Sequence, residues 1–156
     1  MILRRIATVG FAAIGVLSLA GCSEPVTGGT GLLVDNGRVH AVVQMCPNTT
    51  ASEVHLTKAT GSNYFWEPTT WRFDSAEFAT VDLGTLDEFL NLVGDRQMEI
   101  SSNSSGGGGG WVKFDAASIR ALADGEILSF SWTENDSKVL DTVGFENEAL
   151  MFCPGS

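Results

Sequence analysis

The sequence predicts an all-β domain built as a two-layer sandwich. Apolar and polar residues alternate over short runs, which is the pattern of strands with one buried face. Clusters of Gly, Pro, Ser, Asn and Asp separate these runs at the spacing of an all-β fold. Of the 156 residues, 44% are hydrophobic, which is enough for one core and argues against a disordered chain.

The first two strands are expected over residues 32–34 and 39–45, on either side of Asn36-Gly37. Asn-Gly between apolar, β-branched runs is a strong hairpin signal, because both turn residues must accept a positive φ. In the second run the odd-numbered positions share one apolar face. Strict alternation would place Cys46 on the polar face, so the strand is expected to bulge or end there.

Further strands are expected wherever the alternation returns. These runs are, in order, 54–56, 71–73, 78–83, 98–100, 111–114, 128–132 and 150–152. Two short helices are predicted between them. Thr85 and Glu88 have the order of a capping box ahead of a helix that stops at Gly94. Asp115 is expected to cap a second helical turn that stops at Gly125.

Two polar segments are expected to be loops. Residues 101–110 are five Ser and Asn residues followed by five glycines, and this composition predicts a flexible loop between strands. A phosphate-binding loop would need a following helix, and strand is predicted there instead. Glu134–Ser137, with Asp141 nearby, is expected to be a solvated turn, because it lacks the glycine and terminal glutamate of a calcium-binding loop.

One segment carries a resemblance to a fold family, through Phe114, Asp115, Ile119, Leu122, Gly125 and Leu128. It resembles the corner before the penultimate strand of immunoglobulin-like and fibronectin-like sandwiches, where a leucine enters the core and a glycine turns the chain. The resemblance implies a single immunoglobulin-like β-sandwich over residues 32–156 with one or two short helical turns. The tyrosine common at that corner is absent, and an open barrel is the main alternative.

The first residues have the order of an export signal. Arg4 and Arg5 precede an uncharged apolar run over residues 6–19. This run is shorter than the ~20 residues that a membrane-spanning helix needs. The paired arginines leave open whether the chain uses the general secretory route or the twin-arginine route.

The run closes on Leu19-Ala20-Gly21-Cys22, which resembles the lipobox of bacterial lipoproteins. The resemblance implies a signal peptide over residues 1–21 and a diacylglycerol on the Cys22 sulfur. Two acyl chains anchor a domain stably, here to the outer face of the bacterial cytoplasmic membrane or cell envelope. Small residues at 22–31 are expected to be the lipidated tether. The alternative is an ordinary signal peptide with a chance cysteine after the cut.

Cys46 and Cys153 are the remaining cysteines, and in an exported chain they are expected to form a disulfide. A metal site or a catalytic thiol would need histidines in a recognisable setting. The two histidines, His40 and His55, are instead predicted on the polar faces of strands. We therefore expect no metal, no cofactor and no catalytic residue.

The charge excludes one class of partner. The chain has 9 Lys and Arg against 19 Asp and Glu, a net charge of −10, and loss of Arg4 and Arg5 with the leader leaves −12. So acidic a domain is a poor candidate for nucleic acid or an anionic lipid surface.

The aromatic segment 64–71 is the feature that folding explains least. It holds Tyr64, Trp66 and Trp71, with Pro68 keeping the middle out of a central strand. Flat rings beside hydroxyls and a carboxylate suit contact with a sugar or a protein, and the alternative is that these rings fill the core.

The sequence favours a non-enzymatic envelope lipoprotein that binds or scaffolds another envelope component, either a protein or a glycan. A carbohydrate-binding module that uses the aromatic segment is the specific alternative. A small envelope hydrolase would need two carboxylates with separated pKa values in one cleft. A hydrophobic carrier ranks last, because a thin sandwich has few apolar residues to spare for a cavity.

Overall fold

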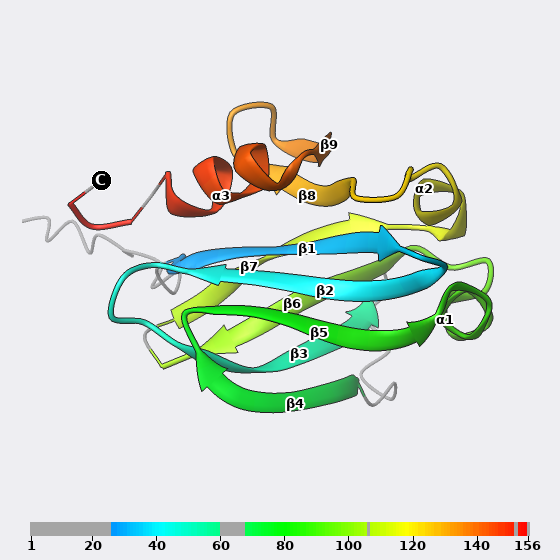
Figure 1. Cartoon of the computed structure of the whole chain (residues 1–156), viewed down its shortest axis with the longest axis horizontal. Coiled ribbons are helices and arrows are strands. Elements are labelled where there is room, and N and C mark those ends of the chain that lie inside the picture. Colours follow the sequence, from blue (N-terminus) through cyan, green and yellow to red (C-terminus); the bar gives the residue numbers. More distant parts are fainter. Residues whose placement is uncertain (1–25, 60–67, 106, 152, 156) are drawn as a thin grey trace, which may run out of the picture.

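The computed structural model describes residues 26–59, 68–105, 107–151 and 153–155. It consists of two antiparallel β-sheets packed face to face, with three short helices (Figure 1). One sheet has the strand order β5-β2-β1-β8-β9 and the other β4-β3-β6-β7. The elements are β1 (Gly28–Asp35), β2 (Arg38–Met45), β3 (Ala51–Lys58), β4 (Thr69–Ala76), β5 (Phe78–Thr85), α1 (Leu86–Val93), β6 (Met98–Ser104), β7 (Gly107–Phe114), α2 (Ala116–Arg120), β8 (Ile127–Ser131), β9 (Asp136–Leu140) and α3 (Thr142–Leu150).

The pairing of the first seven strands confirms the immunoglobulin-like sandwich. The second strand pairs with the fifth in one sheet, and the third pairs with the sixth in the other. This interlocked order is that of immunoglobulin-like domains. The corner before the sixth strand is made by α1, however. The segment 114–128, which carried the resemblance, joins β7 to β8, a strand added after the seven-stranded core.

The β1–β2 hairpin forms as predicted. Asn36 and Gly37 have φ of 49° and 73°, and the strands pair from Asp35↔Arg38 outward. Alternate residues of β2, from Val39 to Met45, are buried between the sheets, and the strand ends at Met45 as expected. The opposite sheet contributes buried residues of the same kind, namely Val54, Leu56, Met98, Ile100, Val112 and Phe114.

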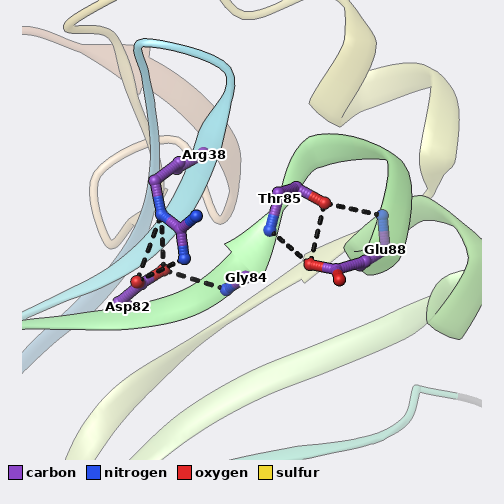
Figure 2. Close-up of polar contacts among 5 residues, drawn as sticks. All are labelled: Arg38, Asp82, Gly84, Thr85 and Glu88. Atoms are coloured by element: carbon purple, nitrogen blue, oxygen red, sulfur yellow. Dashed lines mark hydrogen bonds and ion pairs between the residues drawn. The ribbon is translucent and has the colours of Figure 1, made fainter.

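The helix α1 follows β5 through the predicted capping box (Figure 2). Thr85 Oγ1 accepts from the backbone N–H of Glu88, while Glu88 Oε2 accepts from the backbone N–H of Thr85. Beside it, the Arg38 guanidinium contacts the Asp82 carboxylate across β2 and β5. This ion pair is exposed to solvent, so it contributes little to stability.

Two helices close one end of the sandwich. Phe89 of α1 stacks on Phe114 with ring centroids 5.9 Å apart. Ile119 of α2 and Leu122 beyond it are also buried in the main core. Asp115 caps α2 by accepting from the Ser118 N–H at 2.8 Å, as predicted.

The prediction of a flexible glycine loop was wrong. Residues 98–104 and 107–114 are the paired strands β6 and β7. The absence of side chains lets β7 lie directly against β1. A Cβ on Gly110 would lie 2.9 Å from the Gly28 carbonyl oxygen, and Gly110 has a φ of 73°. These glycines therefore allow a close backbone approach, which composition alone does not reveal.

The tether expected over residues 22–31 ends earlier than predicted. Residues 28–31 are buried in β1, and Val26 already bridges to Gly108 of β7. Inside the sandwich, the Thr30 hydroxyl donates to the Gly109 carbonyl at 2.8 Å and lies 2.8 Å from the Ser102 hydroxyl. Because these polar groups are buried, the hydrogen bonds fix how β1, β6 and β7 meet.

The helix α3 covers the outer face of the five-stranded sheet (Figure 1). Phe145 and Ala149 pack on Val42 and Ile127 in a second, smaller core. This corrects the strand expected at 150–152, where α3 runs to Leu150 and Phe152 lies outside the described residues.

The predicted solvated turn at Glu134–Ser137 is also partly wrong. Glu134 and Asn135 lie in the turn after β8, but Asp136 and Ser137 begin the strand β9. Asp141, expected to lie near that turn, instead caps α3 by accepting from the Gly144 N–H at 2.7 Å.

The predicted disulfide between Cys46 and Cys153 is present, and both cysteines are buried. It joins the end of β2 to the segment that follows α3, across 107 residues of sequence. The bond thereby holds the C-terminal end of α3 against the sheet. In the part of the chain that the structure describes, no helix is long and apolar enough to cross a membrane.

Substitution Gly110→Ala tests the close approach of β7 to β1. We expect a loss of about 2–4 kcal/mol in the free energy of unfolding, because the new Cβ meets backbone atoms as well as an unfavourable φ. Gly37→Ala is the matched control, since Gly37 has the same φ of 73° and nothing within 4 Å of its Cβ position. It should lose only about 1–2 kcal/mol in urea unfolding. Equal losses would contradict the close approach.

Replacing both cysteines, Cys46→Ser with Cys153→Ser, should lower the free energy of unfolding by about 3–5 kcal/mol. The reason is that the bond closes a long loop and thus restricts the unfolded chain. Urea unfolding of the oxidised protein and of the double variant measures the difference. A loss too small to measure would show that the loop closure contributes nothing to stability.

Candidate functional site

A cleft of about 480 Å³ lies where β7 meets β8 and β9. It is called the Trp111 cleft below. It exists because β8 and β9 extend the five-stranded sheet past the edge of the four-stranded one. The Ser137 hydroxyl of β9 donates to the Lys113 carbonyl of β7 at 2.8 Å, which joins the two sheets at this point.

Aromatic rings form one wall of the cleft. Trp111 and Phe130 line it with their ring centroids 4.5 Å apart, and Trp132, outside the lining, meets Phe130 edge-on at 4.9 Å. Trp111 is half-buried, and the Lys113 ammonium lies 5.1 Å from its ring centroid. These contacts hold the indole in place while leaving part of it open to solvent.

Polar groups of four kinds complete the lining. They are the amides of Gln97 and Asn135, the hydroxyls of Ser118 and Ser137, the carboxylates of Asp115 and Asp136, and the amine of Lys113. The cleft thus offers both donors and acceptors around an aromatic wall. The two carboxylates are opposed by one ammonium, so the site carries little excess charge for so acidic a chain.

Two carboxyl groups in this region have shifted pKa values. Hydrogen bonds from the Ser118 N–H and hydroxyl lower the pKa of Asp115. Burial raises the pKa of Glu99, against the opposing attraction of Lys113, its cross-strand neighbour. Glu99 lies outside the residues that line the cleft, so the two shifts do not form an acid–base pair within it.

The lining suits a ligand rich in hydroxyl groups. Sugar rings present apolar C–H faces that pack on aromatic side chains, and their hydroxyls pair with amides, carboxylates and amines. Among the described residues, no three His, Cys, Asp or Glu side chains are grouped to hold a metal ion.

The aromatic segment 64–71 does not supply this site. Trp71 is half-buried on β4 and packs against the main core, in line with the alternative that its ring fills the core. Tyr64 and Trp66 lie outside the described residues, as does the lipidation candidate Cys22.

The histidines lie on outer faces of the sheets, as predicted. His40 is half-buried on β2. His55 on β3 contacts Thr70 at 3.0 Å through Nδ1 and Asn103 at 2.8 Å through Nε2. Neither histidine lines the Trp111 cleft.

The sequence pattern predicted Trp111, Phe130 and Trp132 only as strand residues. Their alternation with polar residues predicts a buried face, and it cannot show that β7, the edge strand of one sheet, lies beside β8 of the other. The one signal in the sequence for a binding site here was that three large aromatic residues lie in two predicted strands, 111–114 and 128–132, next to polar turns.

The chain matches no protein-family model, no curated protein and no solved structure at a significant level. The Trp111 cleft is therefore interpreted from its own chemistry.

The variant Glu99→Gln tests the burial of that carboxyl group. A raised pKa in the folded state means that the folded protein binds the proton more tightly than the unfolded chain does. Stability from Glu99 is thus fully present below the ordinary pKa of glutamate and is lost as the pH rises through the folded value. Urea unfolding should show Glu99→Gln more stable than the parent at pH 8, with the two converging at low pH. Glu146→Gln, whose side chain is exposed on α3, is the control, and a pH-independent difference would contradict the burial effect.

Proposed function

We propose that this chain is an exported, lipid-anchored envelope lipoprotein whose sandwich binds a sugar residue of an envelope glycan without chemical conversion. The lipobox at residues 19–22 supports the anchor. The Cys46–Cys153 disulfide agrees with an oxidising compartment outside the cytoplasm. The Trp111 cleft is the proposed binding site.

The observation that carries the binding proposal is the combination of ring and polar groups in one cleft. Trp111 and Phe130 supply an apolar wall, and amide, hydroxyl, carboxylate and amine groups converge beside it. Small-ligand sites commonly have this composition and a volume of about 300–1,000 Å³. The mixture of polar groups disfavours a hydrophobic ligand, and the net charge disfavours nucleic acid.

The proposed sugar site lies at the Trp111 cleft and not at the aromatic segment 64–71. The sequence suggested the segment 64–71, whose Trp71 packs on the core. Trp111 and Lys113 of β7 and Asp136 of β9 share one lining. A rigid sheet presents these groups with little conformational entropy to lose on binding, which favours a preformed site.

The variant Trp111→Ala tests this function. We expect it to weaken binding of neutral oligosaccharides and of soluble peptidoglycan fragments at least tenfold, because the removed ring buries apolar area worth about 1.5–3 kcal/mol. Calorimetric titration of the parent protein against this panel identifies the ligand, and the variant is then compared on it. Thermal unfolding of both proteins establishes that the variant is folded.

Lys113→Met and Lys58→Met form a matched control pair. Lys113 lines the cleft, whereas Lys58 is exposed at the end of β3, so only the first substitution should weaken binding. Parent protein that binds no member of the panel would overturn the saccharide proposal. Cleavage of a bound oligosaccharide would favour the hydrolase alternative instead.

A further inference from the structure

Four chain segments meet at the end of the sandwich where β1 begins, called the entry end below. The Cys46 N–H donates to the Thr27 carbonyl at 2.8 Å, and the Met45 N–H donates to the Glu77 carbonyl at 2.7 Å. The disulfide brings Cys153 to the same place. Figure 1 shows α1 and α2 at the opposite end of the molecule.

The entry end exposes two large apolar side chains. Phe78, next to Glu77 at the start of β5, is 49% exposed, and Met151, two residues before Cys153, is 41% exposed. Exposed phenylalanine and methionine at one end of a water-facing domain lack the burial that ordinarily stabilises them. Glu77, next to Phe78, is hydrogen-bonded to Met45, and Cys153, two residues after Met151, is disulfide-bonded to Cys46. Both exposed residues therefore lie near the start of β1.

The length of chain before β1 limits how far the entry end can lie from a lipid anchor. Val26, the residue that bridges to β7, lies only four positions after Cys22. Even fully extended, four residues span at most about 14 Å. A lipid on Cys22 therefore keeps the entry end within one headgroup layer or so of the bilayer surface.

The bonded groups of the entry end are mostly uncharged. Thr27 contacts Ser104 at 2.8 Å, and Ser75 donates to Thr50 at 2.7 Å. Two carboxylates also bond here: Glu77 accepts from the Asn48 N–H at 2.8 Å, and Glu148 of α3 accepts from the Ser131 hydroxyl at 3.2 Å.

Charged residues gather at the opposite end. Around the β1–β2 turn, the end of β3, α1 and α2 lie Asp35, Arg38, Lys58, Asp87, Glu88, Asp95, Arg96, Asp115, Arg120, Asp124 and Glu126. These are seven acids against four bases, so this end carries −3 of the net −10 of the described residues, and the charge distribution does not by itself set the orientation.

We propose that the entry end is a membrane-docking surface, with Phe78 and Met151 in the headgroup region of the bilayer to which the chain is anchored. This inference rests on the lipid anchor of the proposed function and is independent of the sugar site. In this orientation the strands stand away from the membrane, and α1 and α2 face outward. The Trp111 cleft then opens on the side of the domain, accessible to a ligand lying along the membrane.

An environment-sensitive nitrobenzoxadiazole label reports docking. The full-length lipidated protein carries the label on the new thiol of Phe78→Cys or, as the control, on that of Asp87→Cys in α1. Seven strand steps from Phe78 to Thr85 place the control about 24 Å away. On vesicles of phosphatidylcholine and phosphatidylglycerol, we expect a blue shift and quenching by spin-labelled lipid for the Phe78→Cys label alone.

Mass spectrometry of each preparation distinguishes failure of the lipid-anchor proposal from failure of the docking proposal. An unlipidated Cys22 overturns the anchor, and with it the docking surface. A lipidated protein whose Phe78→Cys label is as exposed to water as the Asp87→Cys label overturns the docking surface and leaves the anchor intact. Amide hydrogen exchange of the unlabelled lipidated protein is a second readout, and slower exchange around residues 76–80 on vesicles is the expected result.

Discussion

The fold depends on how closely other elements approach β1. Gly29 and Gly31 leave no side chain on the outer face at the start of the strand, so α3 packs closely there, while Gly28 and the small Thr30 let β7 approach from the other side. A Cβ on Gly29 would lie 2.7 Å from the Ala149 Cβ of α3, and one on Gly31 would lie 2.6 Å from Ile127 Cγ2. On the β7 side, Gly110 meets the backbone of β1. Close packing of this kind leaves no room for a methyl group.

The two ends of the sandwich are closed by different means. At the α1 and α2 end, Phe89, Ile119 and Leu122 fill the space between the sheets. At the entry end, the disulfide and short hydrogen bonds among small residues replace such a hydrophobic cover. One end is thus closed by burial of apolar surface and the other by covalent and polar links, which leaves Phe78 and Met151 facing out.

The additions after the seventh strand create the features that bear on function. β8 and β9 widen one sheet, and their edge beside β7 forms the Trp111 cleft. The helix α3 covers the outer face of the same sheet and ends near the disulfide. An immunoglobulin-like core without these additions would have neither the cleft nor the exposed Met151 at the entry end. The proposed functions therefore rest on the C-terminal third of the chain as well as on its first residues.

Local signals in the sequence determined the hairpin at Asn36-Gly37, the capping box at Thr85 and Glu88, and the cysteine pair. The hairpin and the capping box depend on neighbouring residues alone, whereas the cysteine pair, 107 residues apart, follows from there being two cysteines besides Cys22. Only the tertiary structure decided that the glycines at 107–110 form a strand. These glycines pair with the neighbouring strand β6, and they also lie against a segment far away in sequence: Gly108 bridges to Val26, and the Gly109 carbonyl accepts from Thr30 of β1. The same reason applies to the Trp111 cleft, because Trp111 of β7 and Phe130 of β8 belong to different sheets, and strand alternation cannot show that they meet.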